Sequence, residues 1–573
     1  MNTLKIIMAG IIIMLSMQGV TAQTPPSIQW QKSLGGSQDD RANCVLQTTD
    51  GGYIVVGMSS SNDGDVSGHH GLTSQQNYDL WVAKLDGNGS LQWQQSYGGT
   101  GLDYGDFVRP TSDGGYIISG MTSSNDGDVV GWHPGYSGGS PQADAWVVKI
   151  DDSGNLQWQK TLGGSSEDMA HCVQQTSDGN YVVAGYTYST DGDVTGSHGG
   201  NEYWVVKLDA VTQNILWQKT LGGTNHDRGS YIEQNADGNY VVSGFSDSND
   251  GDVSGHHGSY DYWIVKLEDA TQNILWEKSL GGILNDEAGW VRPTTDGNYI
   301  VGGHTRSVDG DVTGKHGYAG STDYWIVKLD GATRNILWEK SLGGTGDDFF
   351  SSIQQTSDGG YIVGGYTYSN DGDVTGLHGV SADYWIVKLD ANGNVEWQKT
   401  LGGTGLDLGG YVQQTNDGGY IVAGGSYSWD GDVTGNHGNN DYWIVKLEGN
   451  GTIPCACCDT SHVTVYDTIT TYITVTDTLV IPITTGVASM PSNTLKVYPN
   501  PAYNHLVIDN GNYIVMSSYS VKITNILGQV VFTQTINQQQ FNIDISAWSA
   551  GNYTLSVLDL QQNVKVSKMI VVQ

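Results

Sequence analysis

The chain has 573 residues, and 60 acidic against 25 basic side chains give it a formal net charge of −35. Such a surface repels a phosphate backbone, so nucleic acid is excluded as an expected partner. The 81 glycines, 18 tryptophans and 32 tyrosines favour short strands joined by tight turns, and they predict an all-β protein.

The first 22 residues have the pattern of a signal peptide. Lys5 precedes a mostly apolar run from Ile6 to Met17, and the small residues of Val20-Thr21-Ala22 stand before a cleavage site ahead of Gln23. The apolar run is too short to span a bilayer, and no second candidate follows it. We therefore expect an exported protein with no membrane span in its mature form.

Residues 23–452 contain seven copies of a repeat of about 60 residues. Two tryptophans mark each copy, the first at Trp30, Trp93, Trp158, Trp217, Trp276, Trp338 and Trp397, the second at Trp81, Trp146, Trp204, Trp263, Trp325, Trp385 and Trp443. Each copy predicts four strands, which in the sixth copy are residues 352–356, 361–365, 384–389 and 395–401. The third of these is apolar at nearly every position, which indicates a strand covered on both faces.

The two ends of the repeat region complement each other. After residues 443–447 the last copy turns through Gly449-Asn450-Gly451 and lacks its fourth strand. A matching strand, residues 27–34, stands before the first complete copy. Its pairing with residues 443–447 predicts a seven-bladed β-propeller closed by an N-terminal strand, which leaves no open sheet edge. An open stack of repeats is the alternative.

The repeat also carries a resemblance. Gly-Gly, an Asp four residues after the second Gly, Asp-Gly-Gly/Asn-Tyr and Asp-Tyr-Trp-Ile-Val-Lys-Leu recur over about residues 28–447. This order resembles the bacterial β-propeller repeat family. The resemblance implies a fold, and that family has no common activity.

Each long loop contains Asp-Gly-Asp-Val, with a histidine seven residues after the first Asp. Two carboxylates around a glycine can hold Ca²⁺ if further oxygens join them. The calcium candidates are Asp63, Asp65, Asp126, Asp128, Asp191, Asp193, Asp250, Asp252, Asp309, Asp311, Asp371, Asp373, Asp430 and Asp432.

The same aspartates also fit a structural interpretation. Each Asp can cap its turn by accepting backbone N–H groups, while the histidine bonds within the loop. The full Asp-x-Asp-x-Asp-Gly calcium pattern is absent, histidine suits calcium poorly, and a transition metal is a third alternative. No other cofactor is expected, and seven equivalent loops do not favour one catalytic site.

Positions where the copies differ are better candidates for function. Arg109 and Arg292 each precede a proline and replace a Gln, and aromatic or basic residues mark the loops of the second, fifth and seventh copies. Aromatic rings beside arginines can stack on sugars or peptides. The ligand-binding candidates are Arg109, Trp132, Trp290, Arg292, Arg306 and Trp429; neutral variation among tolerant loops is the alternative.

The cysteines do not form a disulfide framework. Cys44 and Cys172 occupy the same position in copies one and three and are expected to be small buried side chains. Cys455, Cys457 and Cys458 lie in a Cys/Thr-rich linker, residues 453–493, where export permits a local disulfide. A metal site there is less favoured because no histidine pair stands at a suitable spacing.

Residues 494–573 predict a separate small β-sandwich. The motifs Val497-Tyr498-Pro499-Asn500-Pro501, Asn525-Ile526-Leu527-Gly528-Gln529, Ala550-Gly551-Asn552-Tyr553 and Lys568-Met569-Ile570-Val571-Val572 follow in order. This order resembles the C-terminal sorting domain of the type IX secretion system, type A. It implies the secretion machinery as a partner, export by a Bacteroidetes-like bacterium, and removal of the tail. An ordinary sandwich module is the alternative.

Two functions fit these features. The first is a secreted or cell-surface protein that binds or adheres to a glycan or protein without catalysis. The second is a secreted hydrolase or lyase with an asymmetric site at the propeller channel. The sequence shows no nucleophile elbow, metal-ligand cluster or phosphate loop. A cluster of His, Arg and carboxylates at one end of the channel would favour the enzyme.

Overall fold

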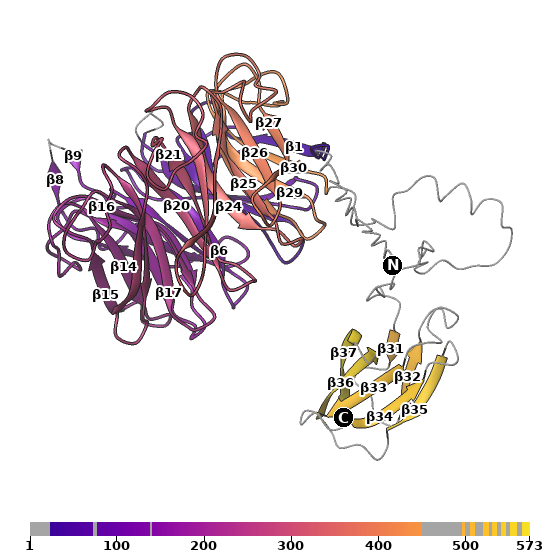
Figure 1. Cartoon of the computed structure of the whole chain (residues 1–573). Helices are drawn as coiled ribbons and strands as arrows, with labels where there is room; N and C mark the ends of the chain where they lie inside the picture. Colours follow the sequence, from indigo (N-terminus) through magenta and orange to yellow (C-terminus); the bar gives the residue numbers. More distant parts are fainter. Residues whose placement is uncertain are drawn as a thin grey trace, which may run out of the picture. The chain divides into compact units, whose positions relative to one another are not determined.

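The structure is a computed structural model that describes residues 23–72, 77–137, 140–449 and seven segments of the tail, 496–498, 505–509, 520–525, 530–535, 540–545, 551–558 and 564–572. The chain consists of two compact units, Met1–Ile453 and Pro454–Gln573 (Figure 1). The predicted signal peptide, the linker and the disulfide among Cys455, Cys457 and Cys458 lie outside the described residues. The described part holds no helix of the length and apolarity that crossing a bilayer requires.

The first unit consists of seven four-stranded antiparallel sheets, here numbered 1 to 7 in the order of their first strands. The first strands are β2 (Asp40–Gln47), β6 (Asp103–Pro110), β12 (Asp168–Gln175), β16 (Asp227–Gln234), β20 (Asp286–Pro293), β24 (Asp348–Gln355) and β28 (Asp407–Gln414). The second strands are β3 (Tyr53–Ser59), β7 (Tyr116–Thr122), β13 (Tyr181–Thr187), β17 (Tyr240–Ser246), β21 (Tyr299–Thr305), β25 (Tyr361–Thr367) and β29 (Tyr420–Ser426).

The third and fourth strands form the outer half of each sheet. The third strands are β4 (Asp79–Leu85), β10 (Asp144–Ile150), β14 (Glu202–Leu208), β18 (Asp261–Leu267), β22 (Asp323–Leu329), β26 (Asp383–Leu389) and β30 (Asp441–Leu447). The fourth strands are β5 (Leu91–Tyr97), β11 (Leu156–Leu162), β15 (Ile215–Leu221), β19 (Ile274–Leu280), β23 (Ile336–Leu342), β27 (Val395–Leu401) and, in sheet 7, β1 (Ile28–Leu34). A short hairpin, β8 (Tyr136–Ser137) and β9 (Ser140–Pro141), stands in the long loop of sheet 2.

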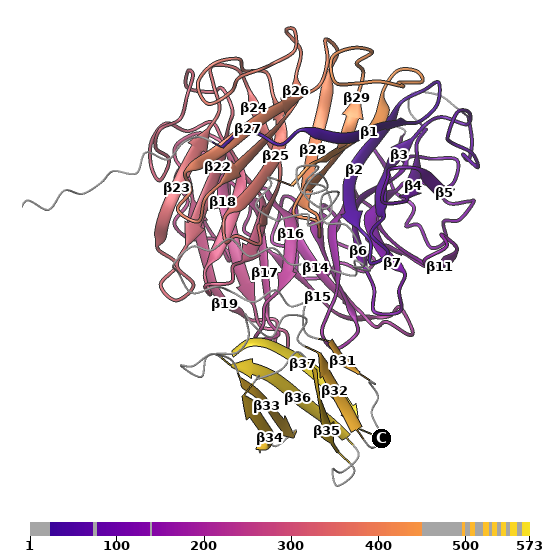
Figure 2. The same ribbon diagram turned by 90° about the vertical axis from the view of Figure 1, so that its right-hand side faces the viewer.

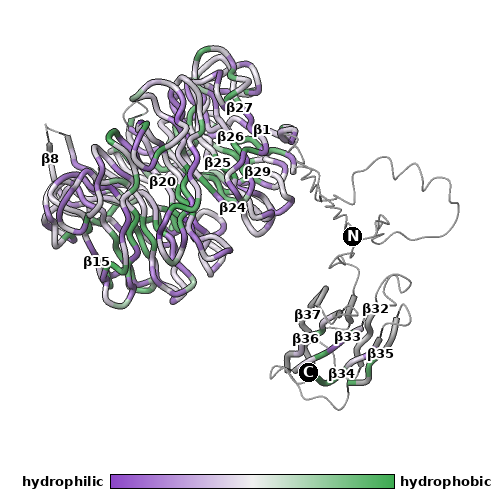
Figure 3. Tube along the Cα trace, viewed as in Figure 1, coloured by the Kyte–Doolittle hydropathy of each residue, from purple (hydrophilic) through white to green (hydrophobic). Residues whose placement is uncertain are grey.

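Neighbouring sheets pack against each other. Each first strand contacts the first strand of the next sheet, and β28 of sheet 7 contacts β2 of sheet 1. Figure 3 shows the hydrophobic residues along the strands and the hydrophilic residues along the loops. Four-stranded sheets whose first strands surround a common axis are the architecture of a β-propeller.

β1 completes the last sheet. It pairs with β30 in antiparallel register, with Ser33 opposite Trp443. The Nε1 of Trp443 also donates to Oε1 of Gln31 at 2.8 Å. Figure 2 shows the indigo β1 beside the orange strands of this sheet. The pairing that the sequence predicted is therefore present, although the two strands lie more than 400 residues apart.

The recurrent Tyr-Trp of the third strand joins neighbouring sheets. The tyrosine hydroxyl donates to the backbone carbonyl of the tryptophan in the next sheet, as Tyr262 does to Trp325 at 2.9 Å and Tyr442 does to Trp81 at 2.8 Å. β26 is buried at all seven positions, as the nearly continuous apolar run of residues 384–389 predicts. In sheets 1 and 2 the tyrosine position holds Leu80 and Ala145, which pack without this hydrogen bond.

The first strand starts earlier than the sequence predicts. In sheet 6 we expect it from Ser352, whereas β24 begins at Asp348, with an irregular register between Phe350 and Ser352. The buried carboxylate of Asp348 accepts the backbone N–H of Gly344 at 2.8 Å and the hydroxyl of Ser369 at 3.0 Å. These bonds hold an acidic residue at a buried strand end, where hydropathy alone predicts a loop.

The second unit contains two antiparallel sheets. One is β31 (Lys496–Tyr498), β32 (His505–Asp509) and β35 (Gln540–Asp544), and the other is β34 (Val530–Thr535), β33 (Ser520–Asn525), β36 (Gly551–Leu558) and β37 (Val564–Val572). Both contribute apolar side chains to the interior, among them Ile543 from the first and Val521, Ile523 and Leu555 from the second.

Candidate functional site

The axis of the propeller is filled by one side chain from each sheet. The fifth residue of each first strand occupies this position: Cys44, Phe107, Cys172, Tyr231, Trp290, Ser352 and Tyr411. All are buried, and the two cysteines are free thiols, as predicted for them. Tyr231 stacks on Trp290 with ring centroids 4.3 Å apart, and the Phe107 and Tyr411 rings each lie 5.5 Å from Trp290. We call these seven residues the axial plug.

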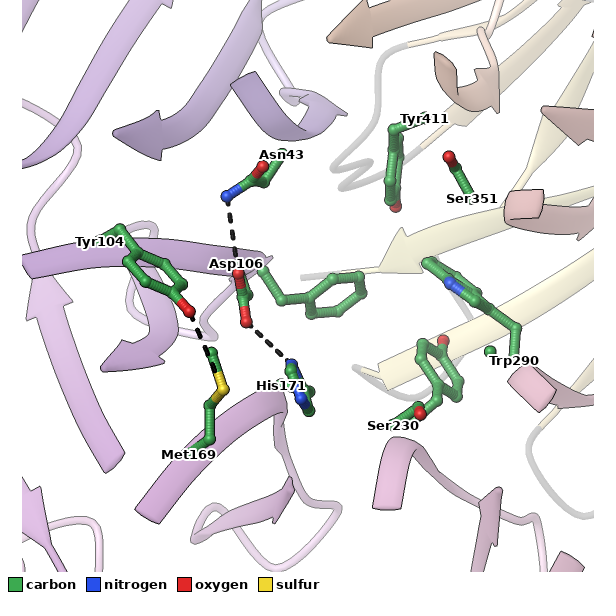
Figure 4. A pocket seen from close by; sticks show the side chains of 12 residues that line it. Asn43, Tyr104, Asp106, Met169, His171, Ser230, Trp290, Ser351 and Tyr411 are labelled. Atoms are coloured by element: carbon green, nitrogen blue, oxygen red, sulfur yellow. Dashed lines mark hydrogen bonds and ion pairs between the residues drawn. The ribbon is translucent and has the colours of Figure 1, made fainter. Parts of the chain in front are cut away.

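A hollow of about 340 Å³ lies against this plug, and we call it the channel hollow. All seven first strands contribute to it, which places it on the axis. Its lining comprises Asn43, Tyr104, Asp106, Phe107, Met169, His171, Ser230, Tyr231, Gly289, Trp290, Ser351 and Tyr411 (Figure 4). Most of these residues precede the plug position in their strands, so the hollow lies toward the strands' N-terminal ends.

One side of the channel hollow is polar and the other is aromatic. The Nδ1 of His171 lies 2.9 Å from Oδ2 of Asp106, and Nδ2 of Asn43 lies 3.5 Å from Oδ1 of the same carboxylate. Figure 4 shows this group across the hollow from Trp290 and Tyr411. His171 and Asp106 remain 31% and 20% exposed, so a ligand in the hollow can reach them.

This site is asymmetric although the fold repeats. The fourth residue of the first strand is Asn43, Asp106, His171, Ser230, Gly289, Ser351 or Gly410, and six of these seven line the hollow. Sequence analysis did not single out any of them. A signal was present in the sequence, because this position varies among Asn, Asp, His, Ser and Gly while the first residue of the strand is always Asp and the sixth is always Val or Ile.

Three of the ligand-binding candidates meet at the axis. Arg109 donates through Nη2 to Oε2 of Glu233 at 2.8 Å, and the Arg292 guanidinium lies 4.8 Å from the centre of the Trp290 ring. Burial would raise the pKa of Glu233, but the charges of Arg109 and Arg292 hold it below its ordinary value. Both arginines follow the plug position in their strands, so they support the plug from the side away from the channel hollow.

The other three candidates lie in separate loops. Trp132 donates through Nε1 to the carbonyl of Gln142 at 2.8 Å, and Arg306 donates through Nε to the Thr322 hydroxyl at 3.3 Å. Trp429 is 66% exposed in the loop of sheet 7. The structure thus places these three residues in the loops of sheets 2, 5 and 7, where each has different neighbours.

The acidic loops are held by backbone hydrogen bonds. The first Asp of each Asp-Gly-Asp accepts, at 2.7–3.0 Å, the N–H of the residue that follows Gly-Gly, as Asp63 does from Ser37. The second Asp accepts a longer bond of 3.3–3.5 Å from the first Gly. Among the described residues, no group of three or more His, Cys, Asp or Glu side chains is placed to hold a metal ion. Calcium binding stays a prediction.

The loop histidines link one sheet to the next. The Nδ1 of His70 lies 2.7 Å from Oδ2 of Asp79, the buried residue that opens the third strand, and its Nε2 lies 3.9 Å from Asp128 of the following sheet. His437 makes the same two contacts with Asp441 and with Asp65 of sheet 1. The histidine recurs in the loops because in most copies it contacts one carboxylate of its own sheet and one of the next sheet.

Replacement of Asp63 by Ala tests the role of the acidic turn. We expect a loss of about 1 kcal/mol in the free energy of unfolding, the usual worth of such a hydrogen bond. Because the loss comes from a backbone contact, it should be equal in EDTA and in millimolar CaCl₂. Thermal melts in both buffers measure it. A rise in the wild-type melting temperature with calcium that the variant lacks would establish a calcium site instead.

Residues 496–573 match the family model described as the secretion system C-terminal sorting domain. This segment is a type IX sorting domain. The match contains all the strands from β31 to β37. The sorting domain directs the protein to the cell surface or the medium and implies contact with the type IX secretion machinery.

The chain is also distantly similar to a curated protein. The regulatory protein FlaEY of Caulobacter vibrioides is 24% identical over 431 residues, which are 70% of this chain and 43% of that protein. The chain therefore spans less than half the length of this curated relative.

Two solved structures resemble the fold of this chain only weakly. PorZ, a surface component of the type IX secretion system of Porphyromonas gingivalis, is 11% identical with a TM-score of 0.37, over 94% of this chain and 60% of PorZ. The Dos1 propeller is 9% identical with a TM-score of 0.38, over 72% of this chain and 95% of its own. At these values neither likeness carries an argument about function.

Proposed function

We propose that this chain is an exported, non-enzymatic binding protein whose ligand enters the channel hollow of a closed seven-bladed propeller. The observation that carries the proposal is the contrast between the repeated acidic loops and the asymmetric channel hollow, to which every first strand contributes. A polar group of Asn43, Asp106 and His171 facing Trp290 and Tyr411 offers both hydrogen bonds and aromatic contact. Seven equivalent loops offer no comparable unique surface.

Closure of the ring is supported by contacts between its first and last sheets. β1 supplies the fourth strand of sheet 7, β2 contacts β28, and His437 reaches Asp65. In this proposal each four-stranded sheet is one blade. The sorting domain is a small β-sandwich of type A, removed after export to leave a released or surface-attached propeller.

The enzymatic alternative rests on the pair of Asp106 and His171. A carboxylate that orients a histidine is also part of a general acid–base site. In the described residues, however, His171 bonds Asp106 and no serine, and neither Arg109 nor Arg292 lines the hollow. Binding is therefore the function that this geometry supports better, and turnover of the bound ligand would favour a hydrolase or lyase.

Substitution of His171 by Ala tests the site. We expect about tenfold weaker binding of the ligand found by glycan and peptide array screening, because one polar contact is lost. The melting temperature should stay close to that of the wild type, since His171 is partly exposed. His226→Ala is the matched control, because His226 pairs with Asn201 and does not line the hollow. Equal binding by wild type and His171→Ala would remove the channel hollow from consideration.

Deletion of residues 496–573 tests the role of the sorting domain. In a host with a type IX system we expect the truncated propeller to stay in the periplasm, because the segment read by the secretion machinery is missing. Immunoblots of surface, medium and periplasmic fractions measure the distribution. Normal surface delivery of the truncated protein would contradict the assignment.

A further inference from the structure

A second hollow adjoins the channel hollow. It has a volume of about 280 Å³ and lies between sheets 2 and 3, and we call it the side hollow. Its lining comprises Leu102, Tyr104, Met121, Ser123, Pro141, Gln142, Ala143, Glu167, Met169 and Tyr186. The first seven belong to sheet 2 and its long loop, and the last three belong to sheet 3.

The two hollows share part of their lining. Tyr104 and Met169 line both, and the Tyr104 hydroxyl donates to the Met169 sulfur at 3.8 Å. Figure 4 shows this pair on the side of the channel hollow where Asp106 and His171 stand. The two hollows therefore lie on either side of the Tyr104–Met169 pair. Together they extend from the axis outward between sheets 2 and 3.

The charges of the lining restrict the ligand. The two hollows together contain the carboxylates of Asp106 and Glu167 and no Lys or Arg. Each carboxylate already has a partner, Asp106 in His171 at 2.9 Å and Glu167 in the Tyr186 hydroxyl at 2.6 Å. An anionic ligand would meet no lysine or arginine in the lining itself, and a strongly cationic ligand would compete with existing bonds.

The polar and aromatic groups fit hydroxyl-rich rings. Asn43 and Gln142 each offer an amide donor and acceptor, and Ser230 adds a hydroxyl, so the lining both donates and accepts. Hydroxyl groups need both functions at once. The rings of Trp290 and Tyr411 in the channel hollow and of Tyr186 in the side hollow add apolar surface to the polar groups, with Trp290 itself stacked on Tyr231.

We propose that the channel hollow and the side hollow together bind a neutral oligosaccharide, with one sugar unit in each hollow and the linkage crossing Tyr104 and Met169. This inference rests on the proposed function and adds the ligand class and a second subsite. It predicts that a chain of sugars binds more tightly than its monomer, because only the chain reaches both hollows.

The test is calorimetric titration of the full chain. The probes are cellotriose, maltotriose, mannotriose and chitotriose, each with its monosaccharide, and trigalacturonic acid as the anionic comparison. We expect at least one neutral trisaccharide to bind about tenfold more tightly than its monosaccharide, and the anionic trisaccharide not to bind.

Two variants separate the subsites. His171→Ala in the channel hollow should weaken binding of trisaccharide and monosaccharide alike. Glu167→Ala in the side hollow should weaken trisaccharide binding about tenfold and leave the monosaccharide unchanged. The matched control is Asp39→Ala, because Asp39 precedes its first strand as Glu167 does and lines neither hollow. Thermal melts confirm that each variant is folded.

The outcomes distinguish this inference from the proposed function. Binding limited to anionic glycans, or trisaccharide binding untouched by Glu167→Ala, would overturn the two-subsite inference. If no glycan binds but a peptide from the array binds and His171→Ala weakens it, the oligosaccharide inference fails while the proposed function stands. Glycan binding that neither variant weakens would overturn both.

Discussion

Deletion of residues 23–34 is expected to lower the melting temperature of the propeller by on the order of 10 °C. The deletion removes β1, so the outer edge of β30 loses its ladder partner, and Trp443 loses the side-chain bond to Gln31. Loss of this hydrogen bond adds to the cost. Differential scanning fluorimetry of the wild-type and truncated chains gives the value.

A peptide of residues 23–36 supplies the control for this deletion. Added in excess, it should pair with β30 and restore part of the melting temperature in a concentration-dependent manner, as mass action requires. A peptide with Trp30 and Gln31 replaced by Ala should restore less. A truncated chain that melts at the wild-type temperature would contradict the role of β1 in closing sheet 7.

The second large effect is a loss of stability as the pH rises from 5 to 8. Each boundary between sheets buries two carboxylates, as at Gly35, where Asp40 of sheet 1 approaches Asp441 of sheet 7. Burial raises the pKa of Asp40, Asp79, Asp144 and Asp348 to about 7 and that of Asp168, Asp286, Asp323 and Asp383 to about 6. Hydrogen bonds from nearby hydroxyl, backbone and histidine groups offset only part of this effect.

The sign of this change in stability with pH follows from the number of protons that the folded and unfolded states bind. These carboxyls have a folded-state pKa above the ordinary value of 3.8, so the folded protein holds more protons between about pH 4 and pH 7. Their contribution to stability is complete below pH 4 and is lost as the pH rises through 6 and 7. Turn residues such as Asp50, whose partner Lys84 lowers its pKa to about 2, act oppositely and lose their contribution only in stronger acid.

Melting temperatures at pH 5, 6, 7 and 8 and constant ionic strength measure this effect. We expect a decrease of several degrees over this range, shallower in Asp79→Asn because one buried ionisable group is gone. The matched control is Asp50→Asn, which removes an exposed carboxylate that is ionised over the whole range and should leave the slope unchanged. A melting temperature that is flat or rises from pH 5 to pH 8 would contradict ionisation of the buried pairs.

Much of the propeller could be predicted from the sequence because local pattern and tertiary packing agree. The apolar run of residues 384–389 indicated a strand covered on both faces, and β26 is buried throughout. The spare strand before the first copy indicated the pairing of β1 with β30. The early start of β24 could not be predicted, because the hydrogen bonds that stabilise buried Asp348 come from Gly344 and Ser369 across a turn.

The candidate site was only partly predictable. Arg109, Trp290 and Arg292 were singled out because they differ from their counterparts, and the structure brings them together at the axis. Asn43, Asp106 and His171 were missed, because each stands about 60 residues from the next and only the circular packing of the first strands unites them. Trp132, Arg306 and Trp429 differ equally in sequence, but the fold places them in separate loops.

Repeated residues and residues that differ between the copies have different roles in this protein. The acidic turns make the same backbone contacts within all seven sheets, and most of the loop histidines and Tyr-Trp pairs connect one sheet to the next. The fourth and fifth residues of the first strands differ between sheets, and they meet at the axis. We place binding there and assign export to the sorting domain.

Hydrogen–deuterium exchange of the full chain, with and without its bound ligand, tests this placement most directly. The account predicts slower exchange on binding in the peptides that contain Asp103–Pro110 and Asp168–Gln175, because β6 and β12 carry Asp106 and His171. Exchange in the loop of Trp429, which lines neither hollow, should not change. Protection confined to that loop, with the first strands unaffected, would contradict binding at the channel hollow.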